Sequence, residues 1–241
     1  MTVSYDGTAY HGFQLQPEGA TIQSVMEEAL ERILQEPVRL RAAGRTDAGV
    51  HAREQVIDFA DSGRRSLEAI VRGGNALLPP DIRILSAEEV SASFDARRHA
   101  KSKEYRYFFY LAPVASPFFA RYALHLTGVA DLGVMREALA HLVGRHDFSA
   151  FRGQGCAART TVREIFRAGI EGEAVPGLYS LRAAGSGFLR HMVRNIVGTL
   201  VDIGRGKTAP DQMRKLLESR DRTLAGATAP PHGLFLWKVA Y

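Results

Sequence analysis

The 241-residue sequence has little cysteine, little lysine and no long apolar run. Its single cysteine, Cys156, cannot form an intramolecular disulfide and has no Cys or His partner at metal-ligand spacing, so we expect neither a disulfide scaffold nor a structural zinc site. No stretch approaches the roughly 18 apolar residues of a membrane helix, and the N-terminus lacks the pattern of a secretory signal. The sequence therefore predicts a globular, cytoplasmic protein without a membrane partner.

Motifs for nucleotide cofactors and catalytic metals are also missing. Residues 204–208, GRGKT, resemble the end of a phosphate-binding P-loop, but Val201 stands where that motif requires glycine. Residues 185–187, GSG, lack the third glycine of a dinucleotide-binding fingerprint, and none of the eight histidines forms an HExxH motif. We therefore expect no cofactor and no metal.

The net charge of +5 points weakly to a polyanionic partner, because phosphate neutralisation drives much of nucleic-acid affinity. Only five of the 31 basic residues are lysines. Guanidinium groups suit bidentate phosphate contacts, although a GC-rich genome would produce the same bias. The basic residues cluster between the predicted elements: Arg97, Arg98, Lys101 and Lys103; Arg159, Arg163 and Arg167; Arg190 and Arg194.

The spacing of apolar residues predicts an α+β fold with two split-βαβ units of the RRM or ferredoxin type. In the first unit we expect strands at 1–5, 38–42, 55–60 and 82–87, a helix at 22–34 capped by Thr21, and a helix between Ser66 and Pro79. In the second we expect strands at 105–111, 160–170, 178–183 and 234–239 and helices at 131–144, 188–203 and from Pro210.

These elements divide the chain into a first domain at residues 1–95 and a second at 103–241. Each would have an antiparallel sheet, with helices on its outer face. The opposite sheet faces would be free to form a central catalytic cleft.

A loop bounded by glycines, residues 44–49, carries Asp47 between two strands of the first unit. Flanking glycines can adopt backbone angles closed to other residues, so the loop could aim an exposed carboxylate. By chemistry alone, however, an Asp in such a loop is more often a turn residue that bonds its own backbone.

The sequence of this loop, GRTDAGVHA at residues 44–52, resembles the signature of the tRNA pseudouridine synthase A family. The resemblance spans nearly the whole chain through YDG at 5–7, HGFQ at 11–14, NALLP at 75–79, FDAR at 94–97, KEYRY at 103–107, HMVRNIVG at 191–198 and DRTLA at 221–225. Phe13 and Leu15 depart from the Trp and Arg often found there, which bears only on local RNA contacts. The cysteines of zinc-binding eukaryotic relatives are absent, so no metal is implied.

The resemblance implies specific roles for three residues, and the pattern of basic residues adds three arginines. Asp47 would be the catalytic aspartate, Tyr105 the aromatic residue against the target base, and Arg194 the cation paired with Asp47. Arg45, Arg97 and Arg98 are candidates for substrate binding. From the residues alone, a packed sheet face is the more common environment for Tyr105, and a solvent-facing helix position is the default for Arg194.

The implied reaction is an isomerisation of uridine to pseudouridine, which needs no cofactor. The implied substrate is tRNA, modified at positions 38–40 of its anticodon arm, and the implied assembly is a homodimer. Two other functions remain open from the residues: a non-catalytic RNA-binding module, because split-βαβ sheets also occur in RNA-recognition domains, and a nucleoside hydrolase that uses Asp47 to release free base.

Overall fold

A computed structural model describes residues 1–128 and 130–241, which divide into two compact units. The first unit comprises residues 1–101 and 235–241, and the second comprises residues 102–234. Each is described by itself. Within the described residues, no helix combines the length and hydrophobicity required to cross a lipid bilayer.

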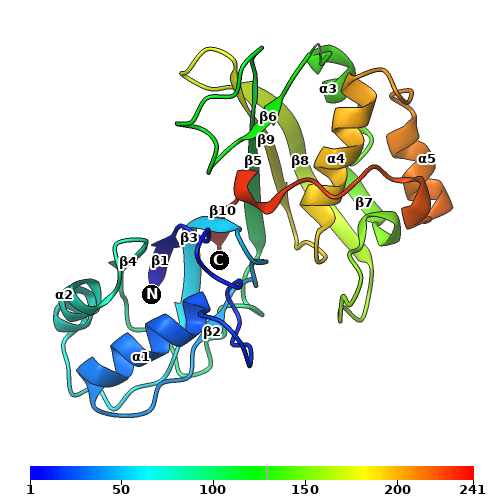
Figure 1. Cartoon of the computed structure of the whole chain (residues 1–241). Helices are drawn as coiled ribbons and strands as arrows, with labels where there is room; N and C mark the ends of the chain where they lie inside the picture. The colour runs from blue at the N-terminus through cyan, green and yellow to red at the C-terminus, as the bar shows by residue number, and fades with distance from the viewer. Residues whose placement is uncertain (129) are drawn as a thin grey trace. The chain divides into compact units, whose positions relative to one another are not determined.

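The first unit has the predicted βαββαβ order (Figure 1). Its elements are β1 (Thr2–Tyr5), α1 (Ile22–Leu34), β2 (Arg41–Ala42), β3 (His51–Asp58), α2 (Leu67–Leu77) and β4 (Ile82–Ser86). The central strand β1 is antiparallel to both β3 and β4, and β2 adds to β3. The prediction of an antiparallel split-βαβ sheet is therefore confirmed here.

The last strand of the chain, β10 (Leu234–Ala240), adds to the sheet of the first unit. Phe235 and Leu236 pair in parallel with His51 and Ala52 of β3. The Lys101 N–H also donates to the Ala240 carbonyl at 2.8 Å. The structure therefore groups residues 235–241 with the first unit, whereas the predicted second domain, 103–241, included them.

Two strand predictions in the first unit were inaccurate at their bounds. The predicted strand 38–42 shrinks to two residues because the N–H groups of Val38 and Leu40 donate to the carboxylates of Glu31 and Glu27 on α1, at 3.1 and 2.8 Å. The next strand begins at His51 rather than at residue 55. Pairing with β10 accounts for this early start.

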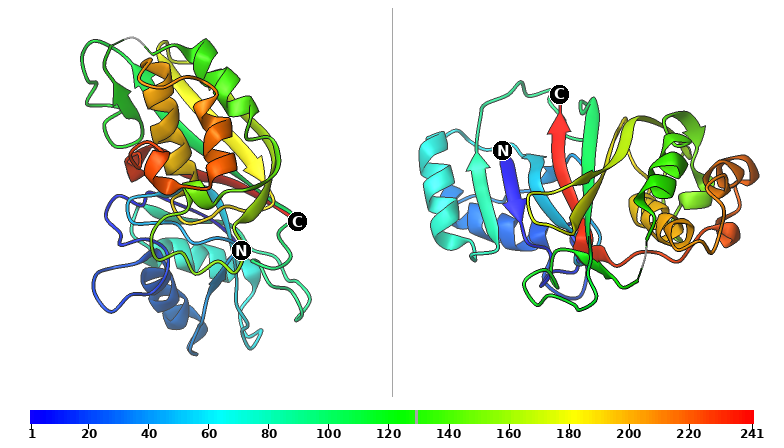
Figure 2. Two further views of the ribbon diagram at one scale, coloured as in Figure 1. Left: turned by 90° about the vertical axis from the view of Figure 1, so that its right-hand side faces the viewer. Right: turned by 90° about the horizontal axis from the view of Figure 1, so that it is seen from above.

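Both helices of the first unit lie on the same side of its sheet (Figure 2). Thr21 caps α1 through a reciprocal capping box with Ser24, as its position predicts. Asn75 on α2 exchanges two hydrogen bonds with the backbone of Ile84 on β4, at 2.8 and 2.9 Å. These contacts fix the helices against a core of Val3, Met26, Ile57, Ile82 and Ile84.

The second unit has an antiparallel sheet in the order β5-β9-β8-β7, with β6 parallel to β5. Its elements are β5 (Ser102–Leu111), β6 (Leu124–Leu126), α3 (Leu132–Ala140), β7 (Gly144–Asp147), β8 (Val162–Gly172), β9 (Leu178–Gly185), α4 (Met192–Gly204) and α5 (Gln212–Ser219), with 3-10 turns η1 (Ser149–Phe151), η2 (Arg222–Leu224) and η3 (Pro231–Gly233). The three helices lie on one side of the sheet (Figures 1 and 2). This arrangement confirms the α+β class.

Three details of the second unit differ from the prediction. Helix α4 begins at Met192 and not at Phe188, because His191 has a φ of 60°, which a right-handed helix cannot contain. Helix α3 ends at Ala140, and Gly144 opens β7. The short strands β6 and β7 were not predicted, since three or four residues carry too little periodicity.

Helix α4 packs unusually closely against the segment that follows α5. A Cβ atom on Gly198 would lie 1.7 Å from the Ala227 carbonyl oxygen. Gly226 makes the reciprocal approach, because its Cβ would lie 2.8 Å from Gly198. Only glycine allows two backbones to come this close.

We predict that Gly198→Ala destabilises the protein, because segment 226–229 would have to move away from α4. Overpacking typically costs about 1–3 kcal/mol, so the melting temperature should fall by about 2–10 °C. Gly169→Ala is the control, since no atom lies within 4 Å of its added Cβ. Calorimetry of both variants checks this, and equal melting temperatures would contradict the close approach.

Candidate functional site

The loop between β2 and β3 carries Asp47 at the start of a tight turn. The Val50 N–H donates to the Asp47 carbonyl at 3.1 Å, and Gly49 has a φ of 73° at the third position of this turn. A positive φ there is the signature of a type II turn, which explains the glycine. The side chain of Asp47 is half-buried and that of Arg45 is exposed. Asp47 is thus a turn residue by its backbone.

Buried hydrogen bonds hold the first half of this loop. The hydroxyls of Thr46 and Tyr5 lie 2.8 Å apart, and the Thr46 carbonyl accepts a bond from the Phe13 N–H at 3.0 Å. Gln55 donates from its amide nitrogen to the Gly44 carbonyl at 2.6 Å. Burial raises the pKa of Tyr5 to about 12, so its hydroxyl stays neutral and hydrogen-bonded at physiological pH.

Residues 7–12 form a second support, which packs directly on the loop backbone. A Cβ on Gly7 would lie 2.1 Å from the Val50 carbonyl oxygen. Gly12 has a φ of 90°, and its Cβ would lie 2.8 Å from the Thr46 carbonyl oxygen. Sequence reasoning missed this support, although the two glycines in YDGTAYHG were a usable signal.

His51 closes the other end of the loop as a packing residue. It is 1% exposed, and its ring stacks on Phe235 at 4.5 Å. Its Nδ1 lies 3.1 Å from the Gly7 N–H and 3.0 Å from an Asp6 carboxylate oxygen. These two contacts are alternatives. Nδ1 accepts from the Gly7 N–H when it carries no hydrogen, and it donates to Asp6 when it carries one.

Tyr105 and Arg194 lie in the second unit, on β5 and on the first turn of α4. Tyr105 is 8% exposed, and Phe188 meets its ring edge-on at a centroid distance of 4.9 Å. Arg194 is half-buried, and its Nε donates to the Ala229 carbonyl at 2.7 Å. The default expectation of a solvent-facing arginine therefore does not describe this side chain.

A buried polar network fixes the segment that holds Arg194. The carbonyl oxygen of the Asn195 side chain accepts bonds from Arg222 at 3.1 Å and from Thr228 at 2.6 Å. Asn195 is fully buried, and the Ala229 N–H donates back to the Arg194 carbonyl at 3.1 Å. Sequence reasoning did not identify Asn195 or Arg222 as supporting residues, because their partners are far away in the chain.

Arg97 and Arg98 extend from a capped turn in the first unit. Their N–H groups both donate to one oxygen of Asp95 at 2.9 Å, and these bonds, from Arg98 first and then Arg97, lower the pKa of that carboxyl. The neighbouring Ala96 N–H donates to Asp58 at 2.8 Å. Both arginine side chains are exposed, so a rigid backbone presents two adjacent cations.

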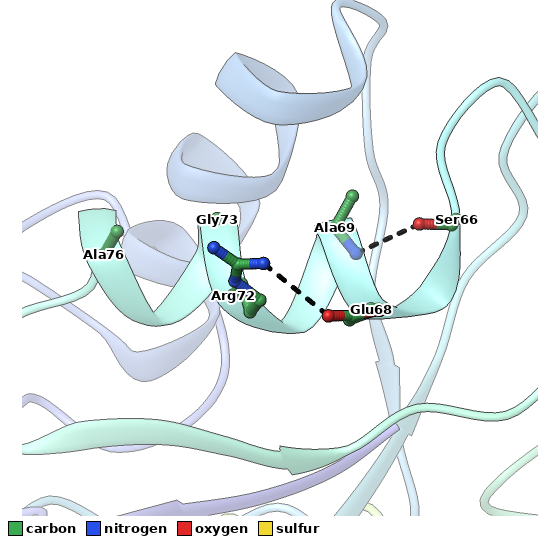
Figure 3. A pocket seen from close by; sticks show the side chains of 6 residues that line it. All are labelled: Ser66, Glu68, Ala69, Arg72, Gly73 and Ala76. Carbon is green, nitrogen blue, oxygen red and sulfur yellow. Dashed lines mark hydrogen bonds and ion pairs between the residues drawn. The ribbon is translucent and has the colours of Figure 1, made fainter.

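Neither a metal site nor the pocket beside α2 involves the predicted site residues, as far as the described residues show. Among the described residues, no three His, Cys, Asp or Glu side chains are placed to hold a metal ion. A shallow pocket beside α2 is lined by Ser66, Glu68, Ala69, Arg72, Gly73 and Ala76 (Figure 3). Its Glu68–Arg72 ion pair spans 3.6 Å between strongly exposed side chains, which makes it a weak surface pair. The pocket contains none of the six predicted site residues.

Comparison with known proteins gives a consistent match along the chain. Residues 1–97 and 138–241 match the model of a family described as tRNA pseudouridine synthase. Proteins named tRNA pseudouridine synthase A from Pelobacter propionicus and Geobacter sulfurreducens are 49% and 47% identical over 241 residues, covering 100% of this chain and 98% of each relative. A similarly named protein of Exiguobacterium sibiricum is 44% identical, covering 100% of this chain and 95% of the relative.

A solved structure of a Cbf5-Nop10-Gar1 complex aligns with a TM-score of 0.31 and 14% identity, covering 84% of this chain and 54% of that chain. A likeness this weak carries no argument about fold or function.

We predict that Gly12→Ala loosens the Asp47 loop, because the new methyl group would press on the Thr46 carbonyl and weaken the bond from Phe13. Amide hydrogen exchange should accelerate at residues 44–50. Gly63→Ala is the matched control, because Gly63 also has a positive φ but no atom lies within 4 Å of its Cβ. If residues 44–50 exchange in Gly12→Ala as slowly as they do in Gly63→Ala, the close approach of Gly12 does not hold the loop.

Proposed function

The chain belongs to the tRNA pseudouridine synthase family, and we propose how its residues isomerise uridine in tRNA to pseudouridine. The observation that carries this proposal is the loop GRTDAGVHA, which combines the family signature with a rigid backbone around Asp47. Within this family assignment, we propose that the modified uridines are those at positions 38–40 of the anticodon arm.

The reaction breaks the bond between uracil N1 and the ribose, joins uracil C5 to the same sugar carbon, and moves one proton, in net terms, from C5 to N1. No electrons are lost and no outside group is transferred, so a single carboxylate can serve as nucleophile or base. We propose Asp47 for this role. Its backbone is held by bonds through Thr46 and Val50, so the carboxylate needs little reorganisation when the substrate arrives.

Tyr105 is proposed as the aromatic partner of the target base. A uridine stacked in an RNA helix must be flipped out before a side chain can reach its sugar, at a cost of a few kcal/mol. Stacking of the flipped base on an aromatic ring stabilises the complex by about 1–3 kcal/mol. The edge-on contact with Phe188 holds the Tyr105 ring in one orientation, which limits the entropy lost when a base binds.

Arg194 is proposed as the cation that stabilises the ionised carboxylate of Asp47. The Nε bond to the Ala229 carbonyl holds this guanidinium beside the first turn of α4, and an arginine presents its donors in a planar fork that suits a carboxylate. Arg45, exposed beside Asp47 in sequence, and the pair Arg97 and Arg98 are proposed to contact tRNA phosphates. We further propose that the protein acts as a homodimer in the cytoplasm, where its tRNA substrate is found.

We predict that Asp47→Asn abolishes pseudouridine formation, because the amide keeps the size of the side chain and removes its charge. Binding of tRNA should stay within about tenfold, since affinity rests on many phosphate and stacking contacts. The measurement is nucleotide-resolved pseudouridine mapping of tRNA after incubation with purified protein, with Asp61→Asn in an exposed loop as the control.

Activity of Asp47→Asn within tenfold of the unmodified protein would exclude the proposed mechanism. The products distinguish the rival functions. Free uracil would indicate a nucleoside hydrolase, and binding by the unmodified protein without turnover would indicate a non-catalytic RNA-binding module.

We predict that replacing Arg97 and Arg98 together by alanine weakens tRNA binding and flattens its salt dependence. Each lost phosphate contact should lower the slope of log K against log salt by about 0.7–0.9. The double variant of Arg64 and Arg65 is the matched control, because these residues are also adjacent, exposed arginines of the first unit. Identical salt slopes for the two double variants, measured by filter binding, would show that the first pair does not contact phosphates.

A further inference from the structure

The loop between β5 and β6, residues 112–123, exposes apolar side chains that the proposed chemistry does not use. We call it the aromatic loop. Phe118 is 86% exposed and Val114 is 78% exposed, the two highest values among the exposed large hydrophobic side chains of the described residues. Tyr122 in the same loop is 40% exposed. Single exposed apolar residues are common, but a group of three on one loop indicates an interaction surface.

The aromatic loop is anchored at its base by Tyr110. This tyrosine is 4% exposed, and its hydroxyl accepts a bond from the Ser116 N–H at 2.8 Å. The rings of Phe119 and His125 lie 5.4 and 4.8 Å from the Tyr110 ring. His125 also contacts the Ala112 carbonyl at 2.8 Å. The loop therefore has a fixed base on the sheet of the second unit.

The conformation of the loop separates its two phenylalanines. The Phe119 carbonyl accepts bonds from the N–H groups of Tyr122 and Ala123 at 2.9 Å, and its own N–H donates to Ser116 at 3.2 Å. Phe119 is thereby fixed with its ring on Tyr110, while the adjacent Phe118 remains exposed. A hydrophobic ring held in solvent by an ordered backbone is already placed for a partner, because little conformational entropy remains to be lost.

The charge of this segment favours an RNA partner. Residues 105–130 contain no aspartate or glutamate, and Arg121, three residues from Phe118, is exposed. Exposed aromatic rings beside cations are the pattern by which proteins bind single-stranded RNA, with bases on the rings and phosphates at the cations.

The size of the exposed surface argues against a second copy of the chain as the main occupant. A large aromatic side chain covers about 150–250 Å² when buried, whereas a stable interface needs about 800 Å² on each partner. Phe118, the smaller Val114 and the partly exposed Tyr122 together fall short of that requirement. A single nucleobase, by contrast, is matched in area by one phenyl ring.

We propose that the aromatic loop is a second RNA-contact site, at which an unpaired base of tRNA stacks on Phe118 and Arg121 binds an adjacent phosphate. The site rests on the proposed function only in taking tRNA as its ligand. It contributes affinity and orientation, and it takes no part in the chemical step.

Three substitutions of Phe118 test stacking. Phe118→Ala should weaken tRNA binding by about 5- to 100-fold and raise KM by a similar factor, while kcat at saturating tRNA stays within about twofold. Phe118→Leu should weaken binding nearly as much, because an aliphatic side chain offers no planar face. Phe118→Trp should bind within about threefold, and tRNA should quench the fluorescence of the new indole.

The controls separate stacking from charge and from misfolding. Val175→Ala removes an apolar side chain that is 43% exposed elsewhere in the second unit and should leave tRNA affinity unchanged. All three Phe118 variants should keep the melting temperature, since the side chain is almost wholly exposed. Phe118→Ala should also leave the salt slope unchanged, because no counterion is released by a neutral ring.

Two results would overturn the proposal: tRNA affinity of Phe118→Ala equal to that of the unmodified protein, or loss of a dimer in light scattering of Phe118→Ala without RNA, which would identify a second copy as the occupant. Binding is measured without turnover, so the two proposals fail separately. If Phe118 governs tRNA binding but no pseudouridine forms, the proposed function fails and the contact site stands.

Discussion

Close backbone packing at glycine is the constraint on which the first unit's candidate site depends. Gly7 and Gly12 bring one segment into direct contact with the carbonyls of Val50 and Thr46, at separations that no side chain would permit. The Asp47 loop is therefore held by main-chain atoms on both sides. A reactive carboxylate gains from such support, because a loop held by its backbone keeps its geometry when solvent or substrate changes around it.

In the second unit, close backbone packing at glycine supports the segment that binds the Arg194 guanidinium. Gly198 and Gly226 let helix α4 meet the segment that carries Ala229, and the buried amide of Asn195 joins the helix to Arg222 and Thr228. A buried amide without partners would destabilise the fold, so a satisfied one defines a single arrangement. The position of the Arg194 guanidinium follows from this arrangement through its bond to Ala229.

The proposed reactive groups and the proposed phosphate and stacking contacts outside the reaction site differ in their exposure. The proposed reactive groups, Asp47 and Arg194, are half-buried on firmly held backbone. The groups proposed to bind RNA, Arg97, Arg98 and Phe118, are exposed side chains on turns anchored by Asp95 or Tyr110. Exposed cations and rings contact a ligand without a large desolvation cost, whereas a reactive carboxylate benefits from partial exclusion of water.

The sequence by itself determined the family, the α+β class and most of the elements, because the loop signature and the periodicity of segments such as 22–34 are local properties. Its resemblance to the family also predicts Asp47, Tyr105 and Arg194 as site residues, and these roles stay predictions. Only the tertiary structure decided that β10 joins the first unit, that residues 38–40 bond to α1 and do not extend a strand, and that Asn195 and Arg222 support Arg194. Each of these depends on hydrogen bonds to partners that only the folded chain brings together, and no local pattern of residues encodes such a partner.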